Sequence, residues 1–348
     1  MRIPFEPEYQ LQYFELLKEV FKSDFLSEGE MTRRFEAAFA GETGSGVEAI
    51  AVTNGGMGLL ALLEAAQVAG GEVIVPANTF MATPLAVQRA GGRVVWADCN
   101  REDLCLSLSD LKKRITSKTR AVVVVHVGGH LAFEIEEIAS FLAEREISLI
   151  EDCAHAHGAR FRGRAAGTFG LGGAYSFYAT KTMPLGEGGM VVTGDRRVAD
   201  YVRRWRNYGK FDYEVSGFNA RMNEVTAALG LVQMERLPRI LQWKRELAGK
   251  YDQIFPRRVR FPQGMISGYY KYIVFETRLK EETGRVFDRP CHEITKTGEW
   301  LPNTDWVRSN HACPPIYYGW DGAELSLSEL ETRLLFQGRS RIQMAAGG

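Results

Sequence analysis

The chain has 348 residues, 45% of them hydrophobic and 25% charged, the composition of an ordinary soluble globular protein that can form a large core. Lysine and arginine total 43, as do aspartate and glutamate, which argues against nucleic acid or an anionic membrane as the main partner. The N-terminus is charged and mixed, unlike a signal peptide, and the longest apolar run, residues 121–125, is too short to cross a bilayer.

The predicted elements alternate between short strands and longer helices. Apolar, β-branched runs predict strands at Ala49–Val52, Val73–Val75, Val94–Ala97, Ala121–His126, Ser148–Glu151, Gly173–Phe177 and Met190–Thr193. Helical patterns occupy Met57–Ala69, Thr83–Arg89, Glu134–Arg145 and Arg196–Trp205. This alternation predicts an α/β fold whose large domain has a mainly parallel seven-stranded sheet wrapped by helices.

A longer helix is predicted over residues 223–248, with Pro238 expected to break or kink it. Past Tyr251 the chain is punctuated by proline and glycine and contains strand-like pieces such as Tyr270–Phe275. We therefore predict a large domain over residues 1–248, including the N-terminal segment, and a smaller α+β domain over residues 249–348.

Polar or aromatic residues follow six of the predicted strands, and open α/β sheets bind ligands at the carboxyl ends of their strands. These residues are Asn54, Asn78, Asp98, His126, Asp152 and Tyr178. We expect them to gather at one edge of the sheet.

Lys181 closes the segment Ser176–Lys181 and precedes the glycine-rich loop Gly186–Gly189. Most lysines lie on the surface, but the aromatic stretch before this one predicts an amine near buried apolar surface, where desolvation lowers the pKa of a lysine. Asp152 ends an apolar strand thirty residues earlier. Pyridoxal phosphate (PLP) needs an amine for its aldehyde, an anion for its pyridine nitrogen, and hydroxyl and amide donors for its phosphate. Together the two segments indicate a PLP site.

The turn Thr53–Gly58 joins a predicted strand to a predicted helix, where glycine amides and the helix dipole favour a phosphate. A flexible turn is the alternative. The turn matches neither G-x-G-x-x-G nor the Walker pattern, so nucleotide binding by those routes is unsupported. Phe80 is either a core residue or the aromatic side chain that stacks on the cofactor ring.

Two other kinds of site fit the sequence less well. A metal site built from His126, Asp152, His155 and His157 leaves Lys181 unexplained, and we expect no metal. A serine hydrolase lacks its G-x-S-x-G turn. Five scattered cysteines, at positions 99, 105, 153, 291 and 313, form no C-x-x-C pair, which predicts reduced thiols and a cytoplasmic protein.

Motifs of one known family occur in order over most of the chain up to about residue 250. In these motifs the chain resembles the DegT/DnrJ/EryC1/StrS family of PLP-dependent nucleotide-sugar aminotransferases, which have the fold type I, aspartate aminotransferase-like architecture. The motifs are Ile3–Phe5, Gly29 to Glu36, Asn54–Gly55, Pro76 to Phe80, His126 to Gly129, Glu151 to Gly158, Ser176 to Lys181, Gly186–Gly189, Arg206–Gly209 and Gly217–Glu224.

The resemblance implies roles for individual residues. Lys181 matches the Schiff-base lysine, which later shuttles a proton, and Asp152 matches the partner of the pyridine nitrogen. His155 would contact the cofactor ring or its 3-hydroxyl, and Phe80 would stack on the ring.

The phosphate would be held by Ser176 and by the backbone amides of Gly56 and Met57. Asn219 would reach it from a neighbouring subunit, which implies an obligate homodimer; Arg221 is a weaker candidate. The family usually has threonine where Gly56 stands. Relatives that act as dehydratases have histidine at the lysine position, so Lys181 favours transamination.

By resemblance the amino donor is L-glutamate and the acceptor is a nucleotide-linked keto sugar. The segments around Asp152 and Lys181 are most similar to enzymes that aminate C-4 of dTDP-4-keto-6-deoxyglucose in deoxyamino-sugar biosynthesis. A C-3 keto sugar, another nucleotide, a PLP-dependent sugar dehydratase and a non-enzymatic regulatory homologue stay open. Tyr269, Lys271, His292, His311 and Tyr317 are further polar or aromatic residues that could contact the sugar.

Overall fold

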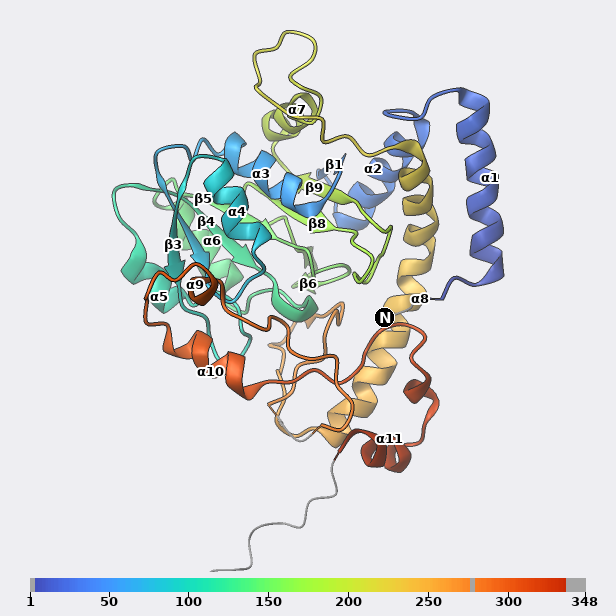
Figure 1. Ribbon diagram of the computed structural model, residues 1–348, viewed down its shortest axis with the longest axis vertical. Helices are drawn as coiled ribbons and strands as arrows, with labels where there is room; N and C mark the ends of the chain where they lie inside the picture. Colours follow the sequence, from blue (N-terminus) through green and yellow to red (C-terminus); the bar gives the residue numbers. More distant parts are fainter. Residues whose placement is uncertain (1–3, 276–278, 336–348) are drawn as a thin grey trace, which may run out of the picture.

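The computed structural model describes residues 4–275 and 279–335, and Figure 1 shows the arrangement of its elements. Ile3 of the first family motif and the end of the predicted second domain lie outside the described residues. Among those that are described, no helix has the length and apolar character needed to cross a membrane.

The predicted seven-stranded sheet is confirmed. Its strands are β1 (Glu48–Val52), β2 (Glu72–Pro76), β3 (Arg93–Ala97), β4 (Thr119–Val125), β5 (Ser148–Asp152), β8 (Gly172–Ser176) and β9 (Gly189–Thr193). They lie in the order β1-β9-β8-β5-β4-β2-β3. β9 runs antiparallel to both of its neighbours, while the other pairings are parallel.

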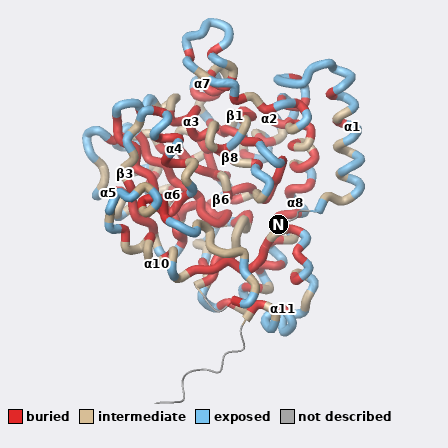
Figure 2. Tube along the Cα trace, in the orientation of Figure 1, coloured by how far each residue is buried: buried red, intermediate tan, exposed pale blue. Residues whose placement is uncertain are grey.

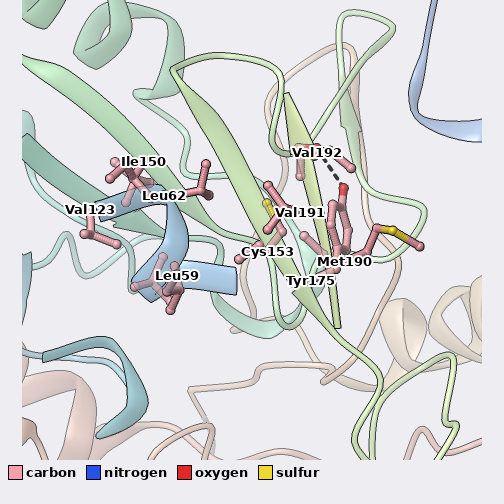
Figure 3. Packing of buried hydrophobic residues seen from close by; sticks show 14 of the residues in the cluster. Leu59, Leu62, Val123, Ile150, Cys153, Tyr175, Met190, Val191 and Val192 are labelled. Atoms are coloured by element: carbon pink, nitrogen blue, oxygen red, sulfur yellow. Dashed lines mark hydrogen bonds between the residues drawn. The ribbon is translucent and has the colours of Figure 1, made fainter. Parts of the chain in front are cut away.

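Helices cover both faces of this sheet, because successive side chains of a strand point to opposite faces. On β8, Ala174 faces α3 (Gly55–Ala65), where it lies 3.1 Å from the position that a Cβ on Gly58 would take. The next residue, Tyr175, contacts Phe39 of α2 (Glu30–Thr43), with ring centroids 5.0 Å apart. Figure 3 shows Leu59 and Leu62 of α3 among the strand residues that form the core.

The other helices of the large core are α4 (Ala82–Arg89), α5 (Leu108–Arg114), α6 (Ile135–Ala143) and α7 (Arg196–Trp205). The first three connect strands, and the fourth, α7, follows the last strand and leads to α8 (Glu224–Ile254). The predicted helices in these positions are confirmed except at α5, which has no counterpart among the predictions. The short 3₁₀ helix η1 (Val127–Gly129) follows β4.

The N-terminal helices were also not predicted. α1 (Pro7–Ser23) runs along the outer side of α8 (Figure 1), and α2 packs between α8 and the sheet. Glu224, at the start of α8, fixes α2 by accepting hydrogen bonds from the Met31 and Thr32 amides at 2.8 and 3.1 Å. A buried carboxylate that receives the free amides of a helix N-terminus satisfies both groups.

α8 (Glu224–Ile254) is 31 residues long and is not broken at Pro238. A proline inside a helix costs about 3 kcal/mol. Here Leu237, Ile240 and Leu241, on both sides of the proline, are buried, and their packing offsets that cost. Of the two predicted outcomes at Pro238, a break or a kink, the structure therefore contradicts the break.

Beyond α8 the chain is mostly irregular, with α9 (Cys291–Ile294), α10 (Pro302–Asn310), η2 (Asp321–Glu324) and α11 (Leu327–Leu334). A small antiparallel sheet joins β10 (Met265–Ile266), β6 (Arg160–Phe161) and β7 (Arg164–Ala165). The expected strand at 270–275 is absent; its Val274 forms isolated bridges with Arg258 and Ala312.

Buried hydrophobic residues form two clusters. Figure 2 shows in red where the buried residues lie along the chain. The smaller cluster contains only residues from Leu247 onward, including Tyr251 and Trp320. α8 crosses the predicted boundary at residue 248 and supplies side chains to both clusters. The division into domains 1–248 and 249–348 stays a prediction.

Candidate active site

A cavity of about 450 Å³ lies where β1, β4, β5 and β8 end. Six of the eight predicted site residues line it: Gly56, Phe80, Asp152, His155, Ser176 and Lys181. The other two, Met57 and Asn219, are not among its lining residues. The cavity therefore brings together an amine, a carboxylate and the N-terminus of α3, as the sequence predicted.

Asp152 is held by two hydrogen bonds. Its Oδ2 accepts from the Thr83 hydroxyl at 2.8 Å, and its Oδ1 accepts from the Ala154 amide at 3.1 Å. The Thr83 hydroxyl lies 2.9 Å from that of Thr79. Because Thr83 donates its proton to the carboxylate, it accepts from Thr79, and this buried chain fixes the carboxylate plane. Within residues 4–275 and 279–335 no cation lies within salt-bridge distance of Asp152, so its charge is available to a ligand.

Lys181 extends its amine into the same cavity. Burial lowers the pKa of Lys181 to about 8, Asp152 opposes this effect, and Lys271 adds to it. The Nζ atom lies 4.8 Å from the ring centroid of Tyr270. A lysine in such a setting is uncharged, and hence nucleophilic, near physiological pH far more often than a surface lysine.

The N-terminus of α3 forms the opposite wall. Asn54 caps the helix by accepting from the Met57 amide at 2.9 Å, so this predicted phosphate donor is occupied in the structure. The amides of Gly55 and Gly56 lie in the first turn beside Ser176. A Cβ on Gly55 would come within 3.0 Å of the Ser176 Cβ, so glycine allows the helix to approach β8 this closely.

The two histidines after β5 differ in their surroundings. His155 stacks on Tyr270, with ring centroids 4.1 Å apart, and its Nδ1 is buried with no partner among the described residues. His157 packs instead against Tyr175 and Phe177 of the core. Burial lowers the pKa of His157 to about 3 and that of His155 well below its ordinary value, so both rings are uncharged.

Of the six residues at strand ends, Asn54, Asp152 and Tyr178 line the cavity, and the other three end or follow strands of the same sheet but do not line it. The Asn78 amide donates to the Leu104 carbonyl at 2.9 Å. Asp98 accepts from the Thr304 amide and hydroxyl, both at 2.7 Å. His126 pairs with Glu151. These side chains satisfy buried groups of neighbouring segments.

His126, Glu151 and Cys153 are the described residues whose ligand-type atoms come close enough to suggest a metal. The side-chain nitrogen and oxygen atoms of His126 and Glu151 already form hydrogen bonds within the protein. Glu151 accepts from the Gly167, Phe169 and Gly170 amides, and His126 Nδ1 accepts from the Ala132 amide at 3.1 Å. The proton on His126 is therefore on Nε2, which donates to Glu151 at 2.8 Å. The arrangement is a buried hydrogen-bond network.

Several lining residues were missed by the sequence analysis: Thr79, Thr180, Tyr270, Val286 and Phe287. None of the five polar or aromatic candidates from the second predicted domain lines the cavity. Tyr269 and Lys271, the two neighbours of Tyr270 that the sequence analysis did name, line a different cavity.

The fold is that of the fold type I, PLP-dependent transferases, and it brings together a lysine, a carboxylate and a helix N-terminus near the ends of the strands. The chain belongs to the DegT/DnrJ/EryC1/StrS aminotransferase family, whose sequence pattern matches residues 8–283. This is a family of PLP-dependent sugar-nucleotide aminotransferases.

Individual relatives agree with this assignment. The chain is 35% identical to GDP-perosamine synthase of Escherichia coli O157:H7, over 81% of this chain and 80% of that one. It is 32% identical to dTDP-4-dehydro-2,3,6-trideoxy-D-glucose 4-aminotransferase of Saccharopolyspora spinosa, over 77% and 76%. The crystal structure of the aminotransferase TlmJ from Streptoalloteichus hindustanus superposes with a TM-score of 0.80 at 30% identity, covering 92% of this chain and 93% of TlmJ.

The pKa of Lys181 gives a pH prediction. Only the uncharged amine attacks an aldehyde, so the rate at which the apoprotein captures PLP should rise with pH and level off above a midpoint near 8. At pH 8 about half of the Lys181 amines are uncharged, against roughly 0.4% for an ordinary lysine. Stopped-flow absorbance across pH 6–10 measures the midpoint; a midpoint near 10 would show that the amine is not desolvated.

The Thr83 hydrogen bond gives a second prediction. Thr83→Val keeps the shape of the side chain but removes the donor to Asp152, and a hydrogen bond to a charged group contributes about 1.5–3 kcal/mol. We expect the dissociation constant for PLP to rise about tenfold or more, measured by equilibrium dialysis. Thr83→Ser restores the hydroxyl and should bind as the wild type does. Equal binding by all three proteins would remove Thr83 from the site.

Proposed function

We propose that the protein transfers the amino group of L-glutamate to C-4 of a nucleotide-linked keto-deoxysugar, with dTDP-4-keto-6-deoxyglucose as the acceptor, and that it uses PLP. The observation that carries this proposal is the cavity that holds Lys181, Asp152 and Ser176 against the N-terminus of α3. The named activity of the Saccharopolyspora spinosa relative supports C-4 as the position. Reduced, buried cysteines fit work in the cytoplasm.

The residues fit the cofactor on three separate grounds. Asp152 is a buried carboxylate without a cation at salt-bridge distance in the described part of the chain, as a partner for a protonated pyridine nitrogen requires. His155 Nδ1 is a buried ring atom that has no described partner. Phe80 is a large apolar side chain that lines the cavity yet is 68% exposed, so a face is free for stacking.

We assign a role to each of the following groups that line the cavity. Ser176 and the Gly55 and Gly56 amides hold the phosphate at the helix N-terminus, where the dipole favours an anion. The bound cofactor supplies an aldehyde that carries the amino group and a ring that withdraws electrons. Lys181 would supply the amine that bonds to this aldehyde and, when free, would remove the proton from Cα of glutamate. In the second half of the reaction it delivers a proton to the sugar carbon that receives nitrogen.

The proposed assembly is an obligate homodimer. Large apolar side chains are exposed on α1 and on the loop before Asn219, among them Phe14, Phe21 and Phe211, the last 90% exposed. Large apolar side chains that are this exposed are what an interface between subunits would cover. Asn219 is exposed and is not a lining residue of its own chain's cavity, which leaves a partner's cavity for it to reach.

Asn219→Ala should therefore raise the dissociation constant for PLP about tenfold, from the loss of one hydrogen bond to a charged phosphate, without changing the sedimentation mass. Mixing this variant with Lys181→Ala subunits tests the geometry. If Asn219 acts across the interface, each mixed dimer regains one intact site, and about a quarter of the wild-type sites should reappear. No recovery would place Asn219 in its own subunit's site or outside any site.

The proposed reaction is tested by absorbance. Purified protein with PLP should show a visible band that needs Lys181 and disappears on addition of L-glutamate. A keto-sugar nucleotide should then restore the band, and NMR of the product shows whether nitrogen is on C-4 or C-3. A band that glutamate leaves unchanged would contradict the donor or the reaction class. Sugar turnover without any amino donor would indicate a dehydratase.

A further inference from the structure

Tyr270 comes from the chain beyond α8, yet it lies against two central residues of the candidate site. Its ring stacks on His155 with 4.1 Å between ring centroids and an angle of 24° between ring planes. Lys181 Nζ lies over the face of the same ring, 4.8 Å from its centroid. Its hydroxyl points elsewhere, 3.4 Å from that of Thr180. The ring face, and not the hydroxyl, is therefore the part that meets the lysine.

The backbone that carries this ring is fixed to the large core. The Gly268 amide and the Ser267 hydroxyl both donate to the Gly129 carbonyl, at 2.7 and 2.9 Å, and the Lys271 amide donates to Gly128 at 2.8 Å. From the other side, the buried amine of Lys244 on α8 donates to the Tyr269 carbonyl at 2.9 Å.

Gly129 makes this contact possible. It has a φ of 107°, and a Cβ there would lie 2.5 Å from the Tyr270 nitrogen. The loop after β4 and the segment 267–271 thus meet backbone to backbone, and the position of the Tyr270 ring follows from that contact.

The face of an aromatic ring is negative and attracts a cation, most strongly where water is excluded. Burial disfavours the charged form of the Lys181 amine. A ring face beneath the amine favours that charged form and does so at one defined position. Burial also raises the pKa of the Tyr270 phenol, so the ring keeps its proton and acts through its face.

We propose that Tyr270 is a positioning residue that holds the free amine of Lys181 in the site through the face of its ring. The proposal rests on the function proposed above only in taking Lys181 as the reacting amine. During turnover this lysine is released from the cofactor and has to stay close to the carbon whose proton it moves. The ring would keep it there.

Other charged and titratable groups also act on this amine. Asp152 on β5 favours its charged form, whereas Lys271 of the segment 267–271 disfavours it. His155 and His157 follow β5 and are uncharged, and Glu187 of the glycine-rich loop lines the cavity. None of these residues changes when Tyr270 is replaced, so a comparison of Tyr270 variants isolates the ring.

The experiment labels the apoprotein with a trace of acetic anhydride across pH 6–10 and measures acetylation of the Lys181 peptide by mass spectrometry. Tyr270→Leu removes the ring face, so the midpoint for Lys181 should fall by about half to one pH unit. Tyr270→Phe keeps the face and should match the wild type within about 0.2 pH unit. The proton-transfer rate with L-glutamate should fall about tenfold for Tyr270→Leu and less than threefold for Tyr270→Phe.

An unchanged midpoint for Lys181 in Tyr270→Leu would overturn the proposal. A shift in Tyr270→Phe as large as that in Tyr270→Leu would also overturn it, because the effect would then come from the hydroxyl. Thermal unfolding of each variant shows whether the fold is kept. If Tyr270→Leu unfolds, Tyr270→Met and Tyr270→Trp provide the same contrast, because only tryptophan keeps a ring face. The labelling needs neither cofactor nor sugar, so it can succeed even if the protein proves not to be an aminotransferase.

Discussion

Lys181→Ala is expected to abolish transamination and the visible band of bound PLP. The side chain supplies both the amine that bonds to the aldehyde and the base that moves the proton, and a positioned base alone contributes roughly 10²–10⁴-fold. The variant should still bind PLP, since Ser176, Asp152 and the α3 amides remain. Absorbance after gel filtration measures the band, and coupled detection of 2-oxoglutarate measures turnover.

Two controls separate these roles of Lys181. Lys181→Arg keeps a cation but cannot give up its proton, so it should be as inactive as the alanine variant. A small primary amine added to Lys181→Ala replaces only the lost base and should restore part of the reaction with L-glutamate. Turnover by Lys181→Ala near the wild-type rate would assign the amine to another residue and withdraw the proposed chemistry.

Asp152→Asn is expected to lower the rate of the glutamate half-reaction by roughly 10²–10³-fold, the effect of removing one partner from a buried charge pair. Asparagine can still accept from one of the two groups that hold the carboxylate, Thr83 or the Ala154 amide, so the fold should be kept. Single-turnover stopped-flow with L-glutamate measures this rate. A loss of less than threefold would remove Asp152 from the chemistry.

The charge itself can be tested with a changed cofactor. PLP methylated on its ring nitrogen carries a permanent positive charge and needs no carboxylate to maintain it. Asp152→Ala leaves room for the methyl group, so its activity should increase with the methylated compound, whereas that of the wild type should not. If both proteins lose activity alike, Asp152 holds the ring by shape and not by charge.

The central sheet could be predicted because most of its strands are short, apolar runs rich in valine and isoleucine, separated by helical patterns. All seven strands begin and end within two residues of the predicted positions. α1 was not predicted although Tyr9, Tyr13, Leu16 and Val20 follow a helical spacing; Leu11, Phe14 and Phe21 add apolar residues on its exposed side, which obscures the pattern. The break predicted at Pro238 does not occur because the helix is held there by packing, which the neighbouring residues in the sequence do not reveal.

The residues of the candidate site also fall into two groups, those that the sequence predicted and those that it did not. Lys181, Asp152 and Ser176 lie at strand ends, where topology determines which side chains converge. Thr83 and Tyr270 were not predicted because their contacts are distant in sequence. Thr83 lies 69 residues from Asp152 and Tyr270 lies 115 residues from His155, and a local sequence pattern does not indicate such contacts. Met57 fits a phosphate-binding turn by its position, but the structure shows its amide already bonded to Asn54.

Glu151 and Asp152 are neighbours on β5, and their carboxylates have different surroundings. Glu151 is tied to His126 and to three amides of the 167–170 turn. Since the side-chain period of a strand is two, a slip of one residue would put Glu151 where Asp152 now meets the cavity and break every one of those bonds. The accuracy with which the fold places the Asp152 carboxylate therefore depends on residues that do not line the cavity. Substitutions at His126 or Gly167 should consequently appear as loss of catalytic rate before loss of folded protein.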